Sequence, residues 1–519
     1  MTDFDAVIIG AGHNGLVCAS YLAKAGKRVL VVDSRSQPGG CASTRELTAG
    51  VRVSDCAQWL HQFDDAVARD LDLAGAGLQL GKGKRTIALQ VDGNHLEIDG
   101  DLLRGAGITT KDQAAFKAFR SQIGVFAKLM LKLYRTRAPK LVEADWTDRI
   151  TLMKLGLGLK LMGKANMQDL MRIVLINIYD VLNENFDHEG LKAALALDAI
   201  TGTNMGPRSP NTVFTYLHRA VGQQLQASGV TQVMGGMGAL GSALLSVAES
   251  AGVQIRLDTR VTAITKTGDR VTGVTLADGS SVSARAVISS ADPTTTFETL
   301  LGYQHMETGM ARRAAQFRNR SGTAKLHLVL SGLPSFTGLD SSALGQRLVI
   351  APTMDAIDTA FNPMKYHECG PSQVFDISIP TIEDPGLAGD GQQVLSALVH
   401  YLPYAPREGW ETLRQQVLDG LLQQLESYAP GLGGLVTHAE LVVPPDFEAS
   451  HGMTGGNWHH GELSIDQALM TRPFPGSTQY ATAVSGLYLC GAGAHPGGSL
   501  MGLAGSNAAR EMLKQGAFA

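Results

Sequence analysis

Residues 7–16 read VIIGAGHNGL, in which a short apolar run leads directly into three closely spaced glycines. A helical pattern follows over residues 15–25 (GLVCASYLAKA), and a second apolar run, RVLVV, covers residues 28–32. A strand, a glycine turn, a helix and a second strand in this order predict a parallel βαβ unit. Such a unit is typical of the doubly wound α/β sheet of Rossmann type, so we expect one domain of this class.

The three glycines, Gly10, Gly12 and Gly15, have the GxGxxG spacing of a dinucleotide-binding turn. The first allows the tight turn, the second lets the backbone approach a pyrophosphate, and the third lets the helix pack closely on the strand. Asp33 ends the next strand, eighteen residues after Gly15, where a carboxylate accepts hydrogen bonds from ribose hydroxyls. Together these residues predict a bound dinucleotide.

Two further groups of glycines bear on the same prediction. Gly39 and Gly40, within SRSQPGGCAST, form a second turn that brings more backbone near the expected ligand. Residues 236–241 also fit GxGxxG, and Asp258 follows at the spacing of a second nucleotide site, which would suit NADPH. Because the preceding segment, VTQVM, has a poor strand pattern, a single dinucleotide site is favoured over two.

The composition excludes several classes of protein. The chain has 519 residues, of which 44% are hydrophobic and 18% charged, as in ordinary globular proteins. Its net charge of −4 gives no electrostatic basis for binding nucleic acid. The five cysteines have neither CxxC nor zinc spacing, so we expect free thiols and no metal site. The acidic N-terminus and the absence of a long apolar stretch predict a cytoplasmic protein.

Glycine-rich turns of the kind found in dinucleotide-binding folds occur in three separate blocks of the chain. We predict an α/β protein, α+β overall, in which residues 1–75, 230–300 and 455–519 form one discontinuous Rossmann-type domain. Residues 76–229 and 301–454 are richer in helical patterns and irregular stretches. They are predicted to form an inserted substrate domain with helices and a mixed or antiparallel sheet.

Four stretches together resemble the phytoene desaturase-like FAD oxidoreductases. They are SRSQPGG, GGMGALGSALLSVAESAGVQIRLDTRVTAI, AVISSADP and SGLYLCGAGAHPGGSLMGLAGSNAAR. Within that family, GAGHNGL, GGNWHHGE and AHPGG are most similar to the branch named pyridine nucleotide-disulfide oxidoreductase domain-containing protein 2. The chain nevertheless has no CxxxxC pair, so disulfide reduction is not expected.

The resemblance implies a non-covalently bound FAD and assigns residues to its parts. Gly10, Gly12 and Gly15 would bind the pyrophosphate, Asp33 would bind the adenosine ribose, and Val261 would contact the adenine through its backbone. Gly39 and Gly40 match the second glycine turn of the family. Near the C-terminus, Gly493, Met501 and Gly502 would lie beside the pyrophosphate, the ribityl chain or the isoalloxazine. A helix beginning at the last two residues would stabilise negative charge on the reduced flavin.

Three histidines are the titratable residues closest to the predicted flavin in these motifs: His459 and His460 in GGNWHHGE, and His495 in AHPGG. A histidine with a pKa near neutrality can accept the proton that leaves when a hydride passes to flavin N5. The same residues can equally serve to hold a loop by hydrogen bonds to its backbone. Both roles stay open at this stage.

The predicted activity is hydride transfer between a substrate carbon and flavin N5, and the resemblance implies a small hydrophobic, polyene or isoprenoid-like substrate. An oxygen-dependent amine oxidase and a non-enzymatic flavoprotein scaffold are the alternatives.

Residues 126–135 and 152–164 combine leucine and methionine with several lysines. Such segments either lie on membrane surfaces or form ordinary helices whose extended lysine side chains cover a core, and the sequence leaves both interpretations open. It also leaves the oligomeric state open.

Overall fold

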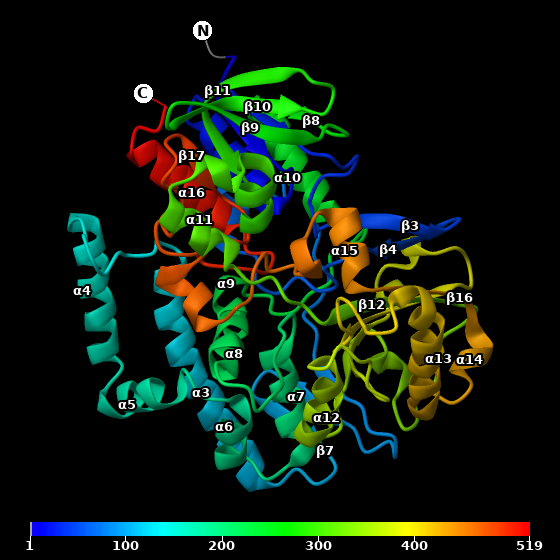
Figure 1. Cartoon of the computed structure of the whole chain (residues 1–519). Coiled ribbons are helices and arrows are strands. Elements are labelled where there is room, and N and C mark those ends of the chain that lie inside the picture. Colours follow the sequence, from blue (N-terminus) through cyan, green and yellow to red (C-terminus); the bar gives the residue numbers. More distant parts are fainter. Residues whose placement is uncertain (1–2, 519) are drawn as a thin grey trace.

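Two large β-sheets, a small two-stranded sheet and the helices around them make up the computed structural model, which describes residues 3–518 (Figure 1). The first sheet has a parallel part to which three distant segments of the chain contribute. In spatial order its parallel strands are β8 (Gln254–Arg256), β2 (Val29–Val32), β1 (Phe4–Ile9), β11 (Ser281–Ser289) and β17 (Leu487–Leu489). The apolar runs of the opening sequence are therefore strands, and the Rossmann-type fold is confirmed.

An antiparallel hairpin extends this sheet. Strands β9 (Val261–Thr267) and β10 (Arg270–Leu276) are joined by a tight turn, and β10 pairs with the first half of β11. The second half of β11 lies between β1 and β17. One long strand thus carries both the hairpin and the centre of the parallel sheet.

Three helices pack together beside the parallel sheet: α1 (His13–Lys24), α10 (Gly238–Ser250) and α16 (Leu503–Lys514). Gly505 of α16 lies so close to α1 that a Cβ there would overlap the carbonyl oxygen of Asn14. The two ends of the chain consequently meet in one core, and Figure 1 shows both termini at the same end of the molecule.

The second sheet is mixed, since β13 and β5 are parallel and the other neighbours are antiparallel. Its order is β16 (Val436–Val442), β12 (Thr323–Leu330), β15 (Gln393–His400), β14 (Val374–Ser378), β13 (Arg347–Ile350), β5 (Thr86–Ala88), β6 (Leu96–Asp99) and β7 (Leu102–Gly105). Helix α13 (Trp410–Tyr428) packs on one face, and α7 (Glu189–Ile200) and α12 (Met354–Met364) pack on the other. The prediction of a mixed sheet beside the Rossmann-type sheet is confirmed, whereas the domain boundaries stay a prediction.

The remaining helices lie mainly in the part of the chain that Figure 1 colours cyan and green. They are α2 (Asp65–Asp70), α3 (Thr110–Tyr134), α4 (Trp146–Leu161), α5 (Lys164–Ile173), α6 (Ile178–Asn185), α8 (Thr212–Ala220), α9 (Gly222–Leu225), α11 (Thr308–Ala315), α14 (Leu432–Leu435) and α15 (Pro444–His451). A two-stranded pair, β3 (Thr44–Thr48) and β4 (Val51–Ser54), completes the fold. None of the helices within residues 3–518 has the length and apolar character needed to cross a bilayer.

Candidate functional site

A cavity of about 850 Å³ is lined by residues of both sheets and of the helices between them. At one end its wall contains the turn between β1 and α1, the residues after β2, and the start of β9. At the other end it contains residues 56–59, 61 and 62, parts of α7 and α8, and residues 458–460 and 463. This volume lies in the range of about 300–1,000 Å³ that is typical of small-molecule and cofactor sites.

The glycine turn at the first end has different requirements at its three positions. Gly10 has φ +100°, in the left-handed region that favours glycine, and a Cβ at Gly15 would overlap the carbonyl oxygen of Gly10. Gly12 has an ordinary φ of −65°, and the nearest protein atom to a Cβ there, Ser290 Oγ, is 3.7 Å away. The protein itself therefore has room for a Cβ at Gly12, which lies in the wall of the cavity.

Helix α1 begins at this turn, with Gly12 as its N-cap and no side chain capping it. The N–H groups of a first helical turn have no intrahelical partner, and the helix dipole adds positive potential there. His13 and Asn14 of this turn also line the cavity. The arrangement suits the phosphate groups of a dinucleotide.

Asp33 lies at the end of β2 and lines the same part of the cavity. Its Oδ2 accepts a hydrogen bond from the N–H of Ala11 (2.6 Å), and its Oδ1 accepts one from the N–H of Arg35 (2.8 Å). Burial raises the pKa of Asp33, and these backbone donors and the Arg35 charge act in the opposite direction. Each carboxylate oxygen keeps a lone pair for a further donor, so the side chain fits a pair of ribose hydroxyls.

The structure brings five of the predicted cofactor residues to the cavity wall: Gly10, Gly12, Asp33, Gly40 and Val261. Gly15 and Gly39 lie behind it. The Gly39 N–H donates to the carbonyl of Ala11 (2.8 Å), and its φ of +101° makes the turn that places Gly40 beside Gly12. These two glycines act through the shape of the turn.

The three predicted residues near the C-terminus are not in the cavity wall. A Cβ at Gly493 would overlap the ring of Pro293, so this glycine serves close packing. Met501 is buried, and Gly502 faces the ring of Phe63. Ser499 and Leu500 line the cavity in place of Met501 and Gly502. The part of the chain that faces the cavity therefore lies two residues earlier than the motif predicted.

The glycines of residues 236–241 have a packing role. A Cβ at Gly238 would come within 2.8 Å of the backbone nitrogen of Thr44, and a Cβ at Gly241 within 2.9 Å of the carbonyl oxygen of Ala42. The start of α10 is thus covered by the turn that contains Gly39 and Gly40. This covering leaves no space there for a second nucleotide.

The three predicted catalytic histidines have different surroundings. His459 and His460 line the cavity. Trp458 Nε1 donates to His459 Nε2 (3.1 Å), which leaves the ring N–H of His459 at Nδ1, where it has no partner within residues 3–518. Burial lowers the pKa of both His459 and His460, and both are therefore neutral at pH 7.

His495 is not brought to the cavity. It is fully buried, with Nε2 3.0 Å from the carbonyl oxygen of Leu133 and Nδ1 3.3 Å from that of Leu469. Burial lowers its pKa to about 4. The ring lies between the carbonyl oxygens of the end of α3 and of residue 469 and so holds these two segments together. This corresponds to the second of the two roles that the sequence left open, a hydrogen bond to a loop backbone.

Sequence reasoning missed several polar side chains at the inner end of the cavity. His218 of α8 is buried, with Nδ1 2.7 Å from the Tyr134 hydroxyl and no partner at Nε2 among the described residues. His61 also lines this end, and its Nδ1 likewise has no partner in the described part of the chain. The segments that carry these residues, TVFTYLHRA and QWLHQF, contain no motif that would have marked them.

A network of four charged residues lies beside these histidines. Asp198 Oδ1 accepts from both Arg219 Nε (2.8 Å) and Arg347 NH2 (2.8 Å), and Arg347 Nε donates to Asp376 Oδ2 (2.8 Å). Trp59 Nε1 donates to the other oxygen of Asp376 (3.0 Å). Two arginines and two aspartates balance in charge, so the inner end is polar and close to neutral.

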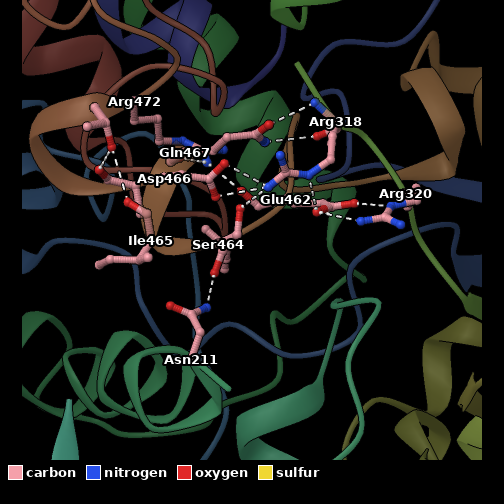
Figure 2. Close-up of polar contacts among 12 residues, drawn as sticks. Asn211, Arg318, Arg320, Glu462, Ser464, Ile465, Asp466, Gln467 and Arg472 are labelled. Carbon is pink, nitrogen blue, oxygen red and sulfur yellow. Dashed lines mark hydrogen bonds and ion pairs between the residues drawn. The ribbon is translucent and has the colours of Figure 1, made fainter. Parts of the chain in front are cut away.

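Residues 462–472, which follow His459 and His460 in the chain, are held by ion pairs and hydrogen bonds (Figure 2). Glu462 accepts from Arg318 Nε (3.0 Å) and Arg320 Nε (2.6 Å), and Arg318 also contacts Asp466 (2.9 Å). Arg472 is fully buried and donates to backbone carbonyl oxygens, which belong to His459, Glu462, Gln467 and Ala492. The histidines therefore face the cavity from a rigid frame.

Comparison with known proteins agrees with this geometry. A family model described as an NAD(P)-binding Rossmann-like domain matches residues 8–72. Pyridine nucleotide-disulfide oxidoreductase domain-containing protein 2 of Mus musculus is 31% identical, over 99% of this chain and 94% of the mouse protein. One of the limonene dehydrogenase polypeptides of Castellaniella defragrans is 26% identical over 98% of this chain and 94% of its own length. The lycopene-forming phytoene desaturase of Pseudescherichia vulneris is 26% identical over 98% of each chain.

Among solved structures, putrescine oxidase bound to putrescine aligns with a TM-score of 0.62 and 14% identity, over 98% of this chain and 99% of that chain. At this identity the likeness concerns the fold. It extends over both sheets, since nearly the whole of each chain is aligned.

Proposed function

We propose that this chain, which belongs to the family of pyridine nucleotide-disulfide oxidoreductase domain-containing protein 2, is an FAD-dependent oxidoreductase. The observation that carries the proposal is the open space at Gly12, beside the uncapped start of α1 and the Asp33 carboxylate. A dinucleotide placed there would continue along the cavity towards the polar inner end. FAD has that extended shape, with a nucleotide at one end and a reactive ring at the other.

The residues at the first end would hold the nucleotide half. The backbone of Gly10 and Gly12 and the N–H groups of α1 would face the pyrophosphate, and Asp33 would accept from the ribose. Val261 would contact the adenine. When bound, the flavin supplies the hydride chemistry, and the protein contributes position, exclusion of water and stabilisation of charge.

Of the three predicted histidines, His460 is best suited to accept a proton. It lines the cavity, and its Nδ1 has no partner among the described residues. Burial keeps the ring neutral by lowering its pKa, and Asp292 acts in the opposite direction by favouring the cation once it forms. His459 presents an N–H and is suited to orient a substrate acceptor group, as is His218 through Nε2.

The substrate that we propose combines an apolar part with at least one hydrogen-bonding group. The names of two relatives, phytoene desaturase and limonene dehydrogenase, support an isoprenoid-like carbon skeleton. The nitrogens of His61, His218 and His459 that lack partners within residues 3–518 require hydrogen bonds from a ligand or water. A pure hydrocarbon substrate would supply none of these hydrogen bonds, and they would then have to come from water.

The cofactor assignment is tested by purifying the full chain and recording its visible spectrum before and after heat denaturation. We expect a flavin spectrum, and release of free FAD on heating because the attachment is non-covalent. If a quinone reoxidises the photoreduced protein, and oxygen does not reoxidise it to form hydrogen peroxide, the protein is supported as a dehydrogenase. Peroxide formed with amines would support the oxidase alternative, and a flavin that no acceptor reoxidises would support the scaffold. A colourless protein that does not bind added FAD contradicts the proposal.

A substitution at Gly12 separates cofactor binding from folding. Gly12→Val is expected to weaken FAD binding on the order of 100-fold, equivalent to about 2.7 kcal/mol, because the side chain would displace the phosphates from their charge-assisted hydrogen bonds. A Cβ at this position lies 3.7 Å from Ser290 Oγ, an ordinary contact distance, and circular dichroism of the variant checks that the chain is folded. FAD titration followed by flavin fluorescence measures the change.

The matched control is Gly420→Ala, in α13, where a Cβ meets nothing within 4 Å in the described part of the chain. It should bind FAD as the unmodified chain does. If Gly12→Val binds FAD with unchanged affinity while keeping its fold, the pyrophosphate does not lie against this turn.

A further inference from the structure

A cluster of exposed apolar side chains covers helices α4 and α5 and the segment before them. Among the described residues, sixteen large hydrophobic side chains are exposed, and nine of them lie between residues 141 and 175. We call these nine the α4 face: Leu141, Val142, Trp146, Ile150, Met153, Leu157, Leu161, Met171 and Leu175. Scattered exposed hydrophobic residues are ordinary, whereas a contiguous group marks an interaction surface.

Five of these residues follow helical spacing along α4. Residues 146, 150, 153, 157 and 161 recur every three or four positions and so lie on one side of the helix. Trp146 is 77% exposed and Leu161 is 74% exposed. On the opposite side Gly158 touches Leu129 of α3, which is how α4 packs on the protein. Helix α4 is therefore apolar on two sides, and the protein covers one of them.

The helix is fastened at its start. Arg137 contacts Asp145, lies 3.0 Å from Asp148 and donates to Glu511 of α16 (2.6 Å). Gln479 Nε2 donates to the same Asp148 (2.8 Å). The start of α4 is thus joined to α16 and to residue 479, and Figure 1 shows α4 and α5 at the edge of the molecule, where a large flat partner can reach them.

Basic side chains predominate along α4 and at the start of α5. Residues 141–175 as a whole carry five basic and four acidic side chains, and two of the acidic ones, Asp145 and Asp148, are paired with Arg137. Residues 149–168 contain Arg149, Lys154, Lys160 and Lys164 and no acidic residue, whereas the chain carries −4. These four side chains are exposed on α4 or at the start of α5. A symmetric dimer through this face would bring the lysines of the two copies together, which disfavours a second copy as the occupant.

We infer that the α4 face binds the surface of a membrane that contains anionic lipids. Its leucine, methionine and tryptophan side chains would enter the boundary between head groups and acyl chains, and its basic residues would contact the lipid head groups. The Arg149 guanidinium lies over the Trp146 ring, 5.4 Å from its centroid. A basic group and an aromatic ring thus lie side by side at the start of α4. The proposal is independent of the cofactor assignment.

The test is sedimentation of the full chain with lipid vesicles. We expect binding to vesicles of phosphatidylcholine with phosphatidylserine, and roughly tenfold weaker binding to vesicles of phosphatidylcholine alone, because the basic residues then lose their partners. The double variant Met153→Glu and Leu157→Glu should bind the anionic vesicles roughly 30-fold more weakly. The double variant Lys154→Gln and Lys160→Gln should lose most of the preference for anionic lipid.

The matched control is Leu102→Glu, at a leucine on β7 that is exposed to a similar degree as Leu157, 52% against 55%. It should bind vesicles as the unmodified chain does, and thermal unfolding should show that all variants are folded. Two results would overturn the inference. One is the absence of vesicle binding, or binding that the α4 variants leave unchanged. The other is a dimer in analytical ultracentrifugation that Leu157→Glu dissociates, with no binding to vesicles.

Discussion

Replacing Arg472 by methionine is expected to lower the free energy of unfolding by about 3–5 kcal/mol, a typical cost of removing one partner of a buried charged hydrogen-bond network. The guanidinium is fully buried, and burial lowers its pKa to about 10, so it is charged at pH 7. It donates to the carbonyl oxygens of His459, Glu462, Gln467 and Ala492. Methionine fills similar space but leaves these oxygens without a donor.

Urea unfolding followed by circular dichroism measures this loss, and Arg472→Lys is the matched comparison. Lysine keeps the charge, yet its three N–H donors lack the planar fork of the guanidinium, so we expect an intermediate stability. Because Arg472 holds the backbone of His459, which lines the cavity, the spectrum of the flavin that we propose should also shift in the variant. A methionine variant as stable as the unmodified chain would show that these carbonyl oxygens find other donors.

Acidification from pH 7 to 5.5 is expected to reduce the free energy of unfolding on the order of 5 kcal/mol, through the buried histidines. Burial lowers the pKa of His13 and His218 to about 3, and that of His400 and His495 to about 4. Above pH 6.5 these rings are neutral in both states and add nothing. Below it, only the unfolded chain takes up protons, so stability falls with pH until the folded-state pKa is reached.

Urea unfolding at several pH values tests this, and single substitutions assign the effect. His400→Gln removes one buried ring outside the cavity wall, and the slope of stability against pH should decrease by about 1.4 kcal/mol per pH unit. His438→Gln, at an exposed position on β16, should leave the slope unchanged. A stability that is constant between pH 7 and 5.5 would show that the buried rings become protonated without cost.

The features that sequence reasoning located correctly are local ones. The strand, turn and helix around Gly10 and Gly15, and the second strand that ends before Asp33, depend on residues within about thirty positions of each other. Gly493, Met501 and Gly502 were placed by a motif alone, and the chain lines the cavity at Ser499 and Leu500 instead. A motif identifies a passage of chain, but the packing of neighbouring segments decides which of its residues face the ligand.

The inner end of the cavity was not predictable in this way. His218 and Arg219 lie in an amphipathic helix, and Asp198 lies in α7, most of which is buried. In the sequence these three resemble any polar residues on helices. Their roles arise because α7, α8 and strands β13 and β14 meet there and exclude water. The same holds for the α4 face, whose spacing shows in the sequence although its exposure does not.

By itself, the sequence determined that a strand of a parallel sheet lies within the first ten residues and leads into a glycine turn and a helix, because backbone geometry and glycine content act over a few residues. Only the tertiary structure decided which histidines reach the cavity, which arginine supports them, and which apolar helix face stays uncovered. Burial and pairing depend on segments hundreds of residues apart, such as Tyr134 and His495, and no local pattern encodes where these segments meet.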